Sequence, residues 1–393
     1  MRFSGPSAAA QVLARIWLLV AAASLFLPSG TRLGWWLPIH LALAGAAGTA
    51  VSGTLPLFAN ALAGAHHLPQ RWDPLVLVTA GAACIALGRP MGVAWLLAVG
   101  GTAYAAGALR LTWLVLAAWQ AGSNRRHTPA LLAYAGAALS LSLGAMLGAL
   151  LGTEAVGGAA VLDVRAAHVT LNAEGFLALA VTGSLLVLVP ITLRVRAPDA
   201  AGRLAVAGLA GGVVLQATGH VAAWAPLVIA GAAAVVLGVA DLVRVGAGAL
   251  ARGPRTPEPG AALHLLAVPV WLMGVAVAVL ALAIAGASAW PLPLVAALTL
   301  GVFVQALLGA WSYLLPVSDP GGSAARRARL QRTRRWARTR AATFNAGGAL
   351  VVLWAAGWAP SPVGTVGLAA AGASALLTIT LASLPAPVTA EAA

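Results

Sequence analysis

Three histidines lie inside long apolar stretches, where an ionisable side chain is costly and needs a reason. His40 follows WWLPI, His168 lies within VRAAHVTLN, and His220 ends QATGH. If the stretches are helices, His40 and His168 lie about six and about seven residues, roughly 9 and 11 Å, from the outer ends of their helices. His220 lies near the outer end of its own. Neutral imidazole is a common ligand of haem iron and copper, so the shared depth indicates a candidate buried cofactor site.

A simpler interpretation stays open for each of them. An isolated histidine in a membrane helix often bonds a backbone carbonyl or a hydroxyl group on a neighbouring helix. For His220, close to the interface, we favour this interpretation. The remaining histidines lie in predicted inner loops or at an inner helix end, where we expect solvated side chains: His66, His67, His127 and His264.

Two polar residues follow His168 along its stretch. Asn172 comes one helical turn later and could orient the imidazole, as groups beside a metal ligand do. Glu174 lies near the middle of the stretch, where a carboxyl group is expensive. It could relay protons, or it could be a neutral acid hydrogen-bonded between helices or the ion-pair partner of Arg165 or Arg110.

Small residues surround His40 on its predicted helical face. Ala44, Ala47 and Gly48 follow it at helical spacing. They leave room for a flat macrocycle beside the imidazole, and they equally permit close helix packing of the small-xxx-small kind.

Composition defines the elements that must position these residues. The chain has 393 residues, of which 61% are apolar and 8% charged, and its mean hydropathy is +0.93. This balance excludes a soluble enzyme, a disordered chain, a coiled coil and a disulfide-stabilised secreted domain. The single cysteine, Cys84, excludes an internal disulfide and a Cys-based zinc site. We therefore predict an all-α polytopic protein of the lipid bilayer, with residues 1–393 forming one integral membrane domain.

Twelve apolar segments are long enough to cross a membrane. They cover approximately residues 11–28, 34–62, 72–88, 91–119, 129–152, 161–194, 203–222, 224–246, 261–287, 291–316, 343–360 and 362–384.

The distribution of arginine predicts the orientation of these spans. Every basic residue other than histidine is Arg, and with a cytoplasmic N-terminus nineteen arginines fall on the inner side and three, Arg32, Arg89 and Arg165, on the outer side. Such a bias follows the positive-inside rule and places both termini in the cytoplasm of a cell with this protein in its plasma membrane. The net charge of +14 is therefore a topology signal, and no nucleic acid is expected as a partner.

The most basic segment lies between the tenth and eleventh spans. Residues 318–342 include RRARLQRTRRWARTR and are predicted to form a basic cytoplasmic loop. The favoured interpretation is a topology anchor in contact with anionic lipid, and the alternative is a docking site for a soluble partner.

A repeated pattern indicates how the spans are arranged. AVSGTLPLFAN, AVTGSLLVLVP and ALLGAWSYLLP end spans two, six and ten, and their glycines Gly53, Gly183 and Gly309 are 130 and 126 residues apart. Four spans separate successive copies. The pattern favours three arcs of four helices.

The chain resembles a family at three of its segments: IHLALAGAAGTAVSG (39–53), AHVTLNAEGFLALAVTGSLLVLVPITLRVR (167–196) and VQALLGAWSYLLPV (304–317). It resembles the twelve-span membrane proteins related to subunit I of the haem–copper oxidases, including the NnrS type. It looks more closely like the membrane module of actinobacterial multicopper oxidase proteins of the copper nitrite reductase-like kind.

The resemblance implies ligands as well as a fold. It implies that His40 binds haem and that His168 and His220 bind copper. Span ten has no histidine here, and His220 stands alone where the oxidases have a pair. Oxygen reduction of the oxidase kind is therefore not expected. The copper domain fused to the closer relatives is missing from this sequence, so a cupredoxin or multicopper oxidase partner would be a separate chain.

Together these observations predict a redox-associated membrane protein. We expect haem b or copper to be held by His40 and His168, with His220 as a further candidate ligand, and electrons to pass to an extracytoplasmic copper enzyme. Two alternatives stay open: a non-catalytic scaffold or assembly protein, and a proton-coupled transporter of a small solute. The sequence leaves open whether the protein is an enzyme.

Overall fold

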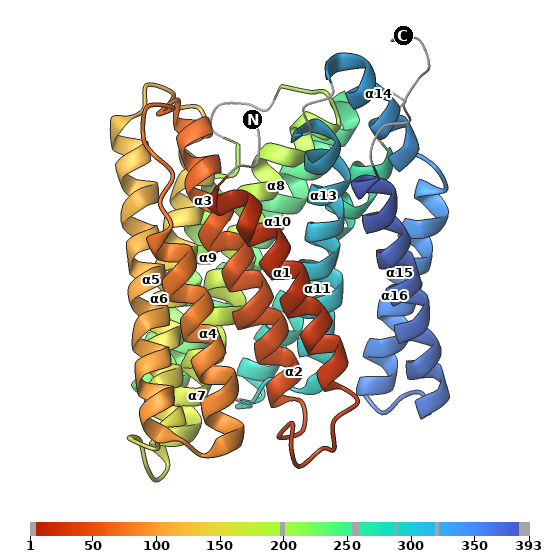
Figure 1. Ribbon diagram of the computed structural model, residues 1–393. Coiled ribbons are helices and arrows are strands. Elements are labelled where there is room, and N and C mark those ends of the chain that lie inside the picture. Colours follow the sequence, from red (N-terminus) through yellow and green to blue (C-terminus); the bar gives the residue numbers. More distant parts are fainter. Residues whose placement is uncertain (1–4, 197–200, 254–258, 288, 319–321, 385–393) are drawn as a thin grey trace.

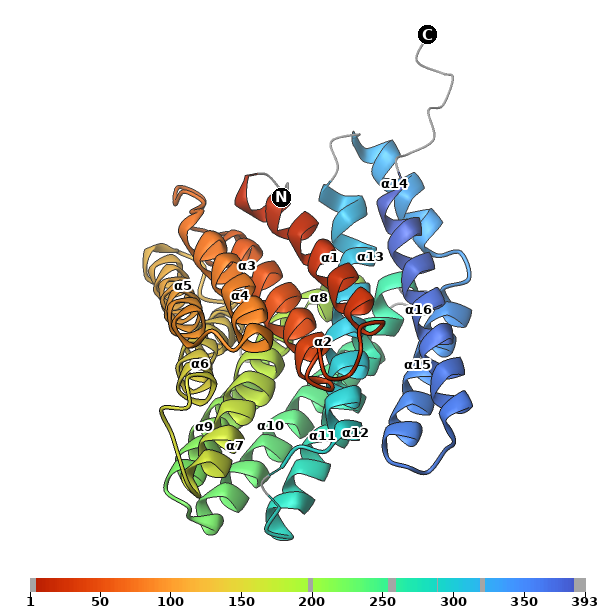
Figure 2. The same cartoon turned by 60° about the horizontal axis from the view of Figure 1, so that its bottom comes forward.

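The protein folds as a bundle of long helices whose axes are broadly aligned (Figures 1 and 2). The computed structural model describes residues 5–196, 201–253, 259–287, 289–318 and 322–384. All regular elements within these residues are helical. Eleven helices in the described ranges are long and apolar enough to cross a membrane, which confirms the prediction of an all-α polytopic membrane protein.

Most of the spans are single α-helices. They are α1 (Pro6–Ser24), α4 (Asp73–Met91), α5 (Ala94–Ala121), α6 (Thr128–Gly152), α9 (Arg203–Val221), α10 (Ala225–Arg252), α11 (Pro259–Ile284), α15 (Ala337–Ala355) and α16 (Ser361–Ser383).

Three spans instead contain a π-helical segment, in which the backbone makes wider turns than in an α-helix. The second span is α2 (Trp36–His40), η1 (Leu41–Ala47) and α3 (Gly48–Ala63). The sixth is α7 (Ala160–Thr170), η2 (Leu171–Ala178) and α8 (Leu179–Thr192). The tenth is α12 (Leu292–Ala296), η3 (Ala297–Val304) and α13 (Gln305–Ser318).

The π-helical segments follow the repeat in the sequence. They begin at Leu41, Leu171 and Ala297 and are therefore 130 and 126 residues apart, the same separations as those of the three repeated glycines. Each carries a glycine at its fifth position against which a side chain of the preceding helix packs. Trp17 of α1 lies on Gly45, Ser140 of α6 on Gly175, and Trp271 of α11 on Gly301.

A second contact repeats twelve residues beyond the start of each π-helical segment. Gly53 meets Ala10 of α1, Gly183 meets Tyr134 of α6, and Gly309 meets Leu265 of α11. In all three cases a Cβ atom on the glycine would overlap the neighbour. One packing scheme is thus used three times, which supports the predicted internal repeat.

The second and sixth spans lie inside the bundle. In the most apolar part of the sixth span 83% of the residues are buried, and in that of the second span 72%, compared with 28% for α1. Polar residues of the second and sixth spans are therefore mainly surrounded by protein. The candidate site residues His40, His168, Asn172 and Glu174 belong to these two spans.

The basic segment after the tenth span differs from its prediction as a loop. Residues Gly322–Thr333 form helix α14, and α15 begins at Ala337, where the sequence predicted a span from 343. Alanine and arginine are good helix formers, and residues 323–340 contain neither glycine nor proline. α15 runs beside α16 (Figure 1), but Arg338 and Arg340 in its first turn make it too polar to count among the eleven apolar spans.

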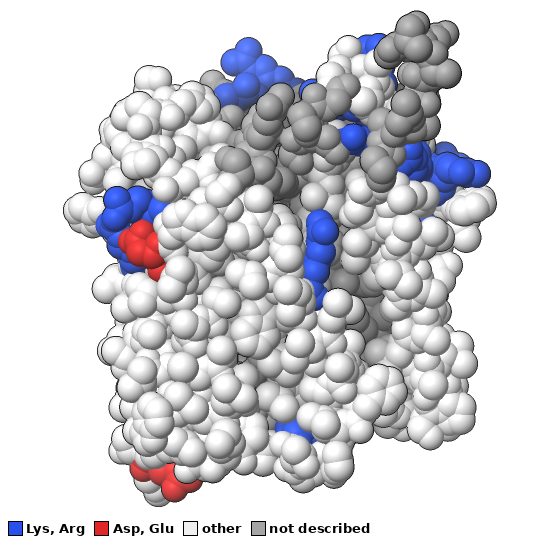
Figure 3. All heavy atoms as spheres, in the orientation of Figure 1, with Lys and Arg blue, Asp and Glu red and all other residues white. Residues whose placement is uncertain are grey.

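Charged side chains are unevenly distributed over the surface. Figure 3 shows a mostly uncharged face, with arginine side chains gathered toward the end that carries α14. The first described helix begins and the last one ends at this same end (Figure 1).

Candidate functional site: two anchored imidazoles and a buried carboxyl group

His40 is held by the helix that carries it. Its Nδ1 atom lies 2.7 Å from the carbonyl oxygen of Trp36, one turn earlier in α2. The imidazole also stacks on the Trp36 ring, with centroids 4.1 Å apart and planes inclined by 22°. A carbonyl oxygen can only accept, so Nδ1 carries the hydrogen and Nε2 of the neutral ring keeps a free lone pair.

His168 is held in the same way by a neighbouring helix. Its Nδ1 atom lies 2.8 Å from the carbonyl oxygen of Gly144 in α6 and therefore donates to it. Nε2 is again the atom with the free lone pair. The ring also lies on Gly148, where a Cβ atom would be 2.8 Å from the imidazole Cε1.

Asn172 lies beside His168, as the sequence predicts for an orienting group. Its Nδ2 donates to the His168 carbonyl oxygen at 2.7 Å, and the side chain covers Gly144. Nδ2 is also 3.3 Å from the His168 Nδ1. Nδ1 already donates to the Gly144 carbonyl oxygen. Asn172 therefore limits where the ring can lie and does not decide which ring nitrogen carries the hydrogen.

His40 and His168 come from spans two and six, and an electrostatic interaction links the two imidazoles. Both side chains are half-buried. Each is thus anchored through Nδ1 to a main-chain carbonyl and offers Nε2, which is the tautomer that metal-ligating histidines commonly adopt.

His220 lies in a different environment. It lines a small cavity of about 20 Å³ together with Gln216 and Trp290. Its charged neighbour is Asp163 of α7. Within the described ranges no three His, Cys, Asp or Glu side chains gather as a metal site would require, so the pairing of His168 with His220 as copper ligands stays a prediction.

Glu174 is buried within η2 and has a neutral partner. Its side chain is 3% exposed, and Gln216 of α9, 1% exposed, donates its Nε2 hydrogen to Oε2. Oε1 of Glu174 and Oε1 of Gln216 are both buried without a protein partner in the described structure. The structure thus pairs the carboxyl group with an amide, rather than with Arg165 or Arg110.

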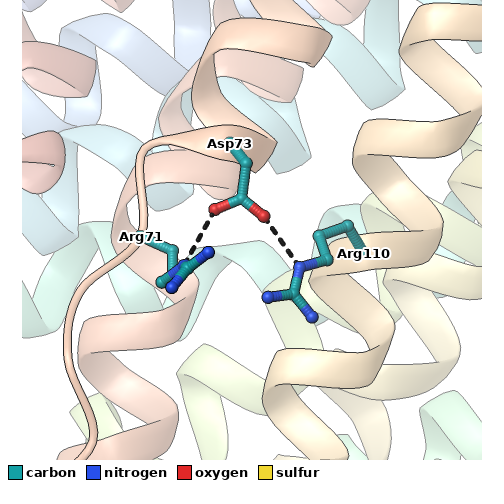
Figure 4. A network of polar contacts seen from close by, with 3 residues as sticks. All are labelled: Arg71, Asp73 and Arg110. Atoms are coloured by element: carbon teal, nitrogen blue, oxygen red, sulfur yellow. Dashed lines mark hydrogen bonds and ion pairs between the residues drawn. The ribbon is translucent and has the colours of Figure 1, made fainter.

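Arg110 has a partner of its own, shown in Figure 4. Its Nε lies 2.7 Å from Oδ2 of Asp73, whose Oδ1 lies 3.2 Å from Nε of Arg71. The three side chains are about one third to one half exposed, and they join the start of α4 to the middle of α5. The interpretation of Arg110 as the partner of Glu174 is therefore wrong, because Asp73 reaches the guanidinium group from the adjacent helix.

The small residues beyond His40 are used for helix packing. The Tyr104 hydroxyl of α5 donates to the Ala44 carbonyl oxygen at 3.0 Å, and a Cβ atom on Gly48 would overlap that hydroxyl. The sequence left open whether these small residues make room for a macrocycle or permit close helix packing. Close packing accounts for this face.

One of the predicted solvated histidines is instead buried. His264 of α11 is 0% exposed, neither ring nitrogen has a protein partner in the described structure, and the ring contacts Phe344 edge-on. The prediction was wrong because this face of α11 packs against α15, where Phe344 covers the ring, even though His264 lies close to the start of the helix at Pro259. His66 and His67 are exposed, as predicted, while His127 is half-buried and its pKa is lowered by burial and by the charge of Arg126.

Sequence reasoning also missed two partners of the site. Trp36 was not considered as a partner of His40, although its position four residues earlier in the sequence was visible. Gln216 lies four residues before His220 in the same apolar stretch and was overlooked as a partner for Glu174.

No protein-family model matches the chain, and no curated protein matches it. The proposed function therefore depends on the geometry of these residues.

Proposed function

We propose that His40 and His168 bind one redox metal, copper or the iron of haem b, in the outer half of the membrane. The protein would thereby serve electron transfer toward a copper enzyme on the outer face. The observation that carries the proposal is the matched anchoring of the two rings. Each Nδ1 donates to a carbonyl oxygen, and two Nε2 lone pairs on separate spans are left as ligands.

The chemistry of the two residues fits such a group. Imidazole nitrogen suits both copper and haem iron, and a hydrogen-bonded Nδ1 fixes the orientation of the ring and strengthens Nε2 as a ligand. Bound there, the metal would supply a centre that takes up and releases one electron. Trp36, Gly144 and Asn172 would keep the two rings in position while its charge changes.

The environment of the rings favours the same role. Both belong to the two most buried spans, and each side chain is itself half-buried in protein. A neutral imidazole pair needs no neighbouring carboxylate, and the buried Glu174 is already bonded to Gln216. The partner that accepts the electron would be a cupredoxin or multicopper oxidase chain.

The test is a spectrum and a metal analysis of the protein purified in mild detergent after expression with haem and copper supplied. We expect one metal per chain, with a reduced-minus-oxidised haem band if the metal is haem iron. His40→Ala and His168→Ala should each lower the occupancy at least tenfold, since each removes one of two ligands. His66→Ala/His67→Ala, which changes two exposed histidines, should leave it unchanged.

Two results would contradict the proposal. One is a folded wild-type protein that contains neither haem nor stoichiometric copper. The other is a His40→Ala/His168→Ala double variant that retains all of its metal.

A further inference from the structure

Helix α14, the turn that follows it and the first turn of α15 carry exposed positive charge. We call this feature the arginine corner and define it by the exposed residues Arg326, Arg327, Arg335, Trp336 and Arg338. The sequence contains no Asp or Glu from residue 320 to residue 390. The corner therefore has no acidic residue nearby in its own segment.

A buried arginine fixes the backbone of the corner. Arg340 is 3% exposed, and its guanidinium group donates to the carbonyl oxygens of Thr333 at 2.6 Å and Arg335 at 3.2 Å. It also donates to the Thr378 hydroxyl of α16 at 2.7 Å. These bonds hold both sides of the turn against α16, so the exposed side chains project from a rigid support.

The turn itself has a costly conformation. Trp336 has φ of +51°, a left-handed value that a bulky residue rarely adopts. Its indole ring is nevertheless 61% exposed, with the Arg335 guanidinium carbon 5.2 Å from its centroid. The fold thus turns a large aromatic side chain outward beside the arginines, at a cost of about 1–3 kcal/mol.

Several arginines elsewhere in the chain form an ion pair with a carboxylate, and the arginines of the corner differ from them. Arg71 and Arg110 pair with Asp73, and Arg244 pairs with Asp241. In the part of the chain that the structure describes, no ion pair involves Arg326, Arg327, Arg335 or Arg338. Among the described residues nothing balances these four charges, so an anion from outside the chain can supply the negative charge.

The position of the corner identifies the source of that charge. It lies at one end of the bundle and next to α16, which exposes Val366 and Leu376 along its length as a lipid-facing helix does. At such a boundary the available anions are lipid phosphates, which arginine binds through paired N–H groups. An exposed tryptophan is typical of the same headgroup layer.

We propose that the arginine corner is a binding site for the phosphate groups of anionic phospholipids. The guanidinium groups of Arg326, Arg327 and Arg338 bind the phosphates, and the Trp336 ring lies among the headgroups. Arg340 is a positioning residue, which keeps the turn in shape and does not contact the lipid. The proposal is independent of the metal site.

The experiment measures lipids bound to the purified full-length protein by native mass spectrometry, in micelles with equal parts phosphatidylglycerol and phosphatidylcholine. The wild type should retain phosphatidylglycerol selectively. Each arginine near an anionic lipid surface contributes roughly fivefold in affinity, so Arg326→Gln/Arg327→Gln/Arg338→Gln should weaken phosphatidylglycerol binding by about 100-fold.

The matched control removes three other exposed arginines, Arg196→Gln/Arg203→Gln/Arg252→Gln, and should retain the selectivity. An equal loss in both variants would overturn the proposal, because it would show a general effect of net charge. So would unchanged binding in the first variant. Displacement of the lipid by inorganic phosphate would identify a soluble anion as the ligand instead.

Discussion

At the scale of single residues, the candidate site depends on the hydrogen bond that Nδ1 of each histidine makes, because this bond leaves Nε2 as the free nitrogen. Unanchored, each imidazole could rotate and exchange tautomers. The carbonyl oxygens of Trp36 and Gly144 remove that freedom by accepting from Nδ1. The one ring is supported by its own helix and the other by a neighbouring helix, so the second support is more sensitive to helix packing.

Gly148 provides the sharpest test of this support. Gly148→Ala would place a Cβ atom 2.8 Å from Cε1 of His168, and the ring could make room only by leaving the Gly144 carbonyl oxygen. A lost hydrogen bond of about 0.5–1.5 kcal/mol and a gain in helix propensity of about 1 kcal/mol nearly cancel. We therefore expect an almost unchanged melting temperature and at least tenfold less bound metal.

The matched control lies one turn further along α6. Gly152→Ala places its Cβ atom 3.5 Å from the nearest Leu97 atom, an ordinary contact. It should keep the metal content of the wild type. If both variants bind metal equally well, the anchoring of His168 has no part in binding.

At the scale of elements, the repeated glycines of the π-helical segments determine how closely the preceding helix approaches. Gly301→Ala would overlap the Trp271 ring, whose Nε1 donates to Asn345 of α15 at 2.7 Å. Overpacking of this kind costs about 1–3 kcal/mol, so we expect a lower melting temperature of the purified protein in detergent. Gly274→Ala, at an open position of α11, adds helix propensity without overlap and should not lower it.

Elements were easier to predict from the sequence than their internal geometry. Span existence follows from runs of apolar residues, which is why eleven spans and the glycine repeat agree with the structure. The π-helical segments were not predicted, because one wider turn leaves no trace in hydropathy. The helix in residues 322–333 was missed because its charge was interpreted as a loop signal, although its residues favour a helix.

The site was predictable only in part, for a related reason. His40, His168 and Asn172 could be selected because polar residues in apolar stretches are few. The partners Trp36 and Gly144 could not, since they contribute carbonyl oxygens that every residue possesses. Likewise, the pairing of Arg110 with Asp73 depends on how α4 lies against α5 (Figure 4), which spacing along the chain does not specify.

At the scale of the whole molecule, the charge asymmetry predicts an orientation that labelling can test. In a Cys84→Ala background, Gly157→Cys and Ala324→Cys each place one exposed thiol at opposite ends of the bundle. The positive-inside rule predicts that an impermeant maleimide labels Gly157→Cys in intact cells and Ala324→Cys only after permeabilisation. The reverse pattern would place both histidines of the site in the inner half of the membrane.

The threefold packing scheme also separates folding from chemistry. The third copy keeps its π-helical turn and its two contact glycines, yet it presents Leu294 and Ala296 where the register of the other copies has His168 and His40. The third copy therefore keeps the packing of the other two without a histidine at either position. The architecture of each copy is thus independent of the side chains that we propose as ligands.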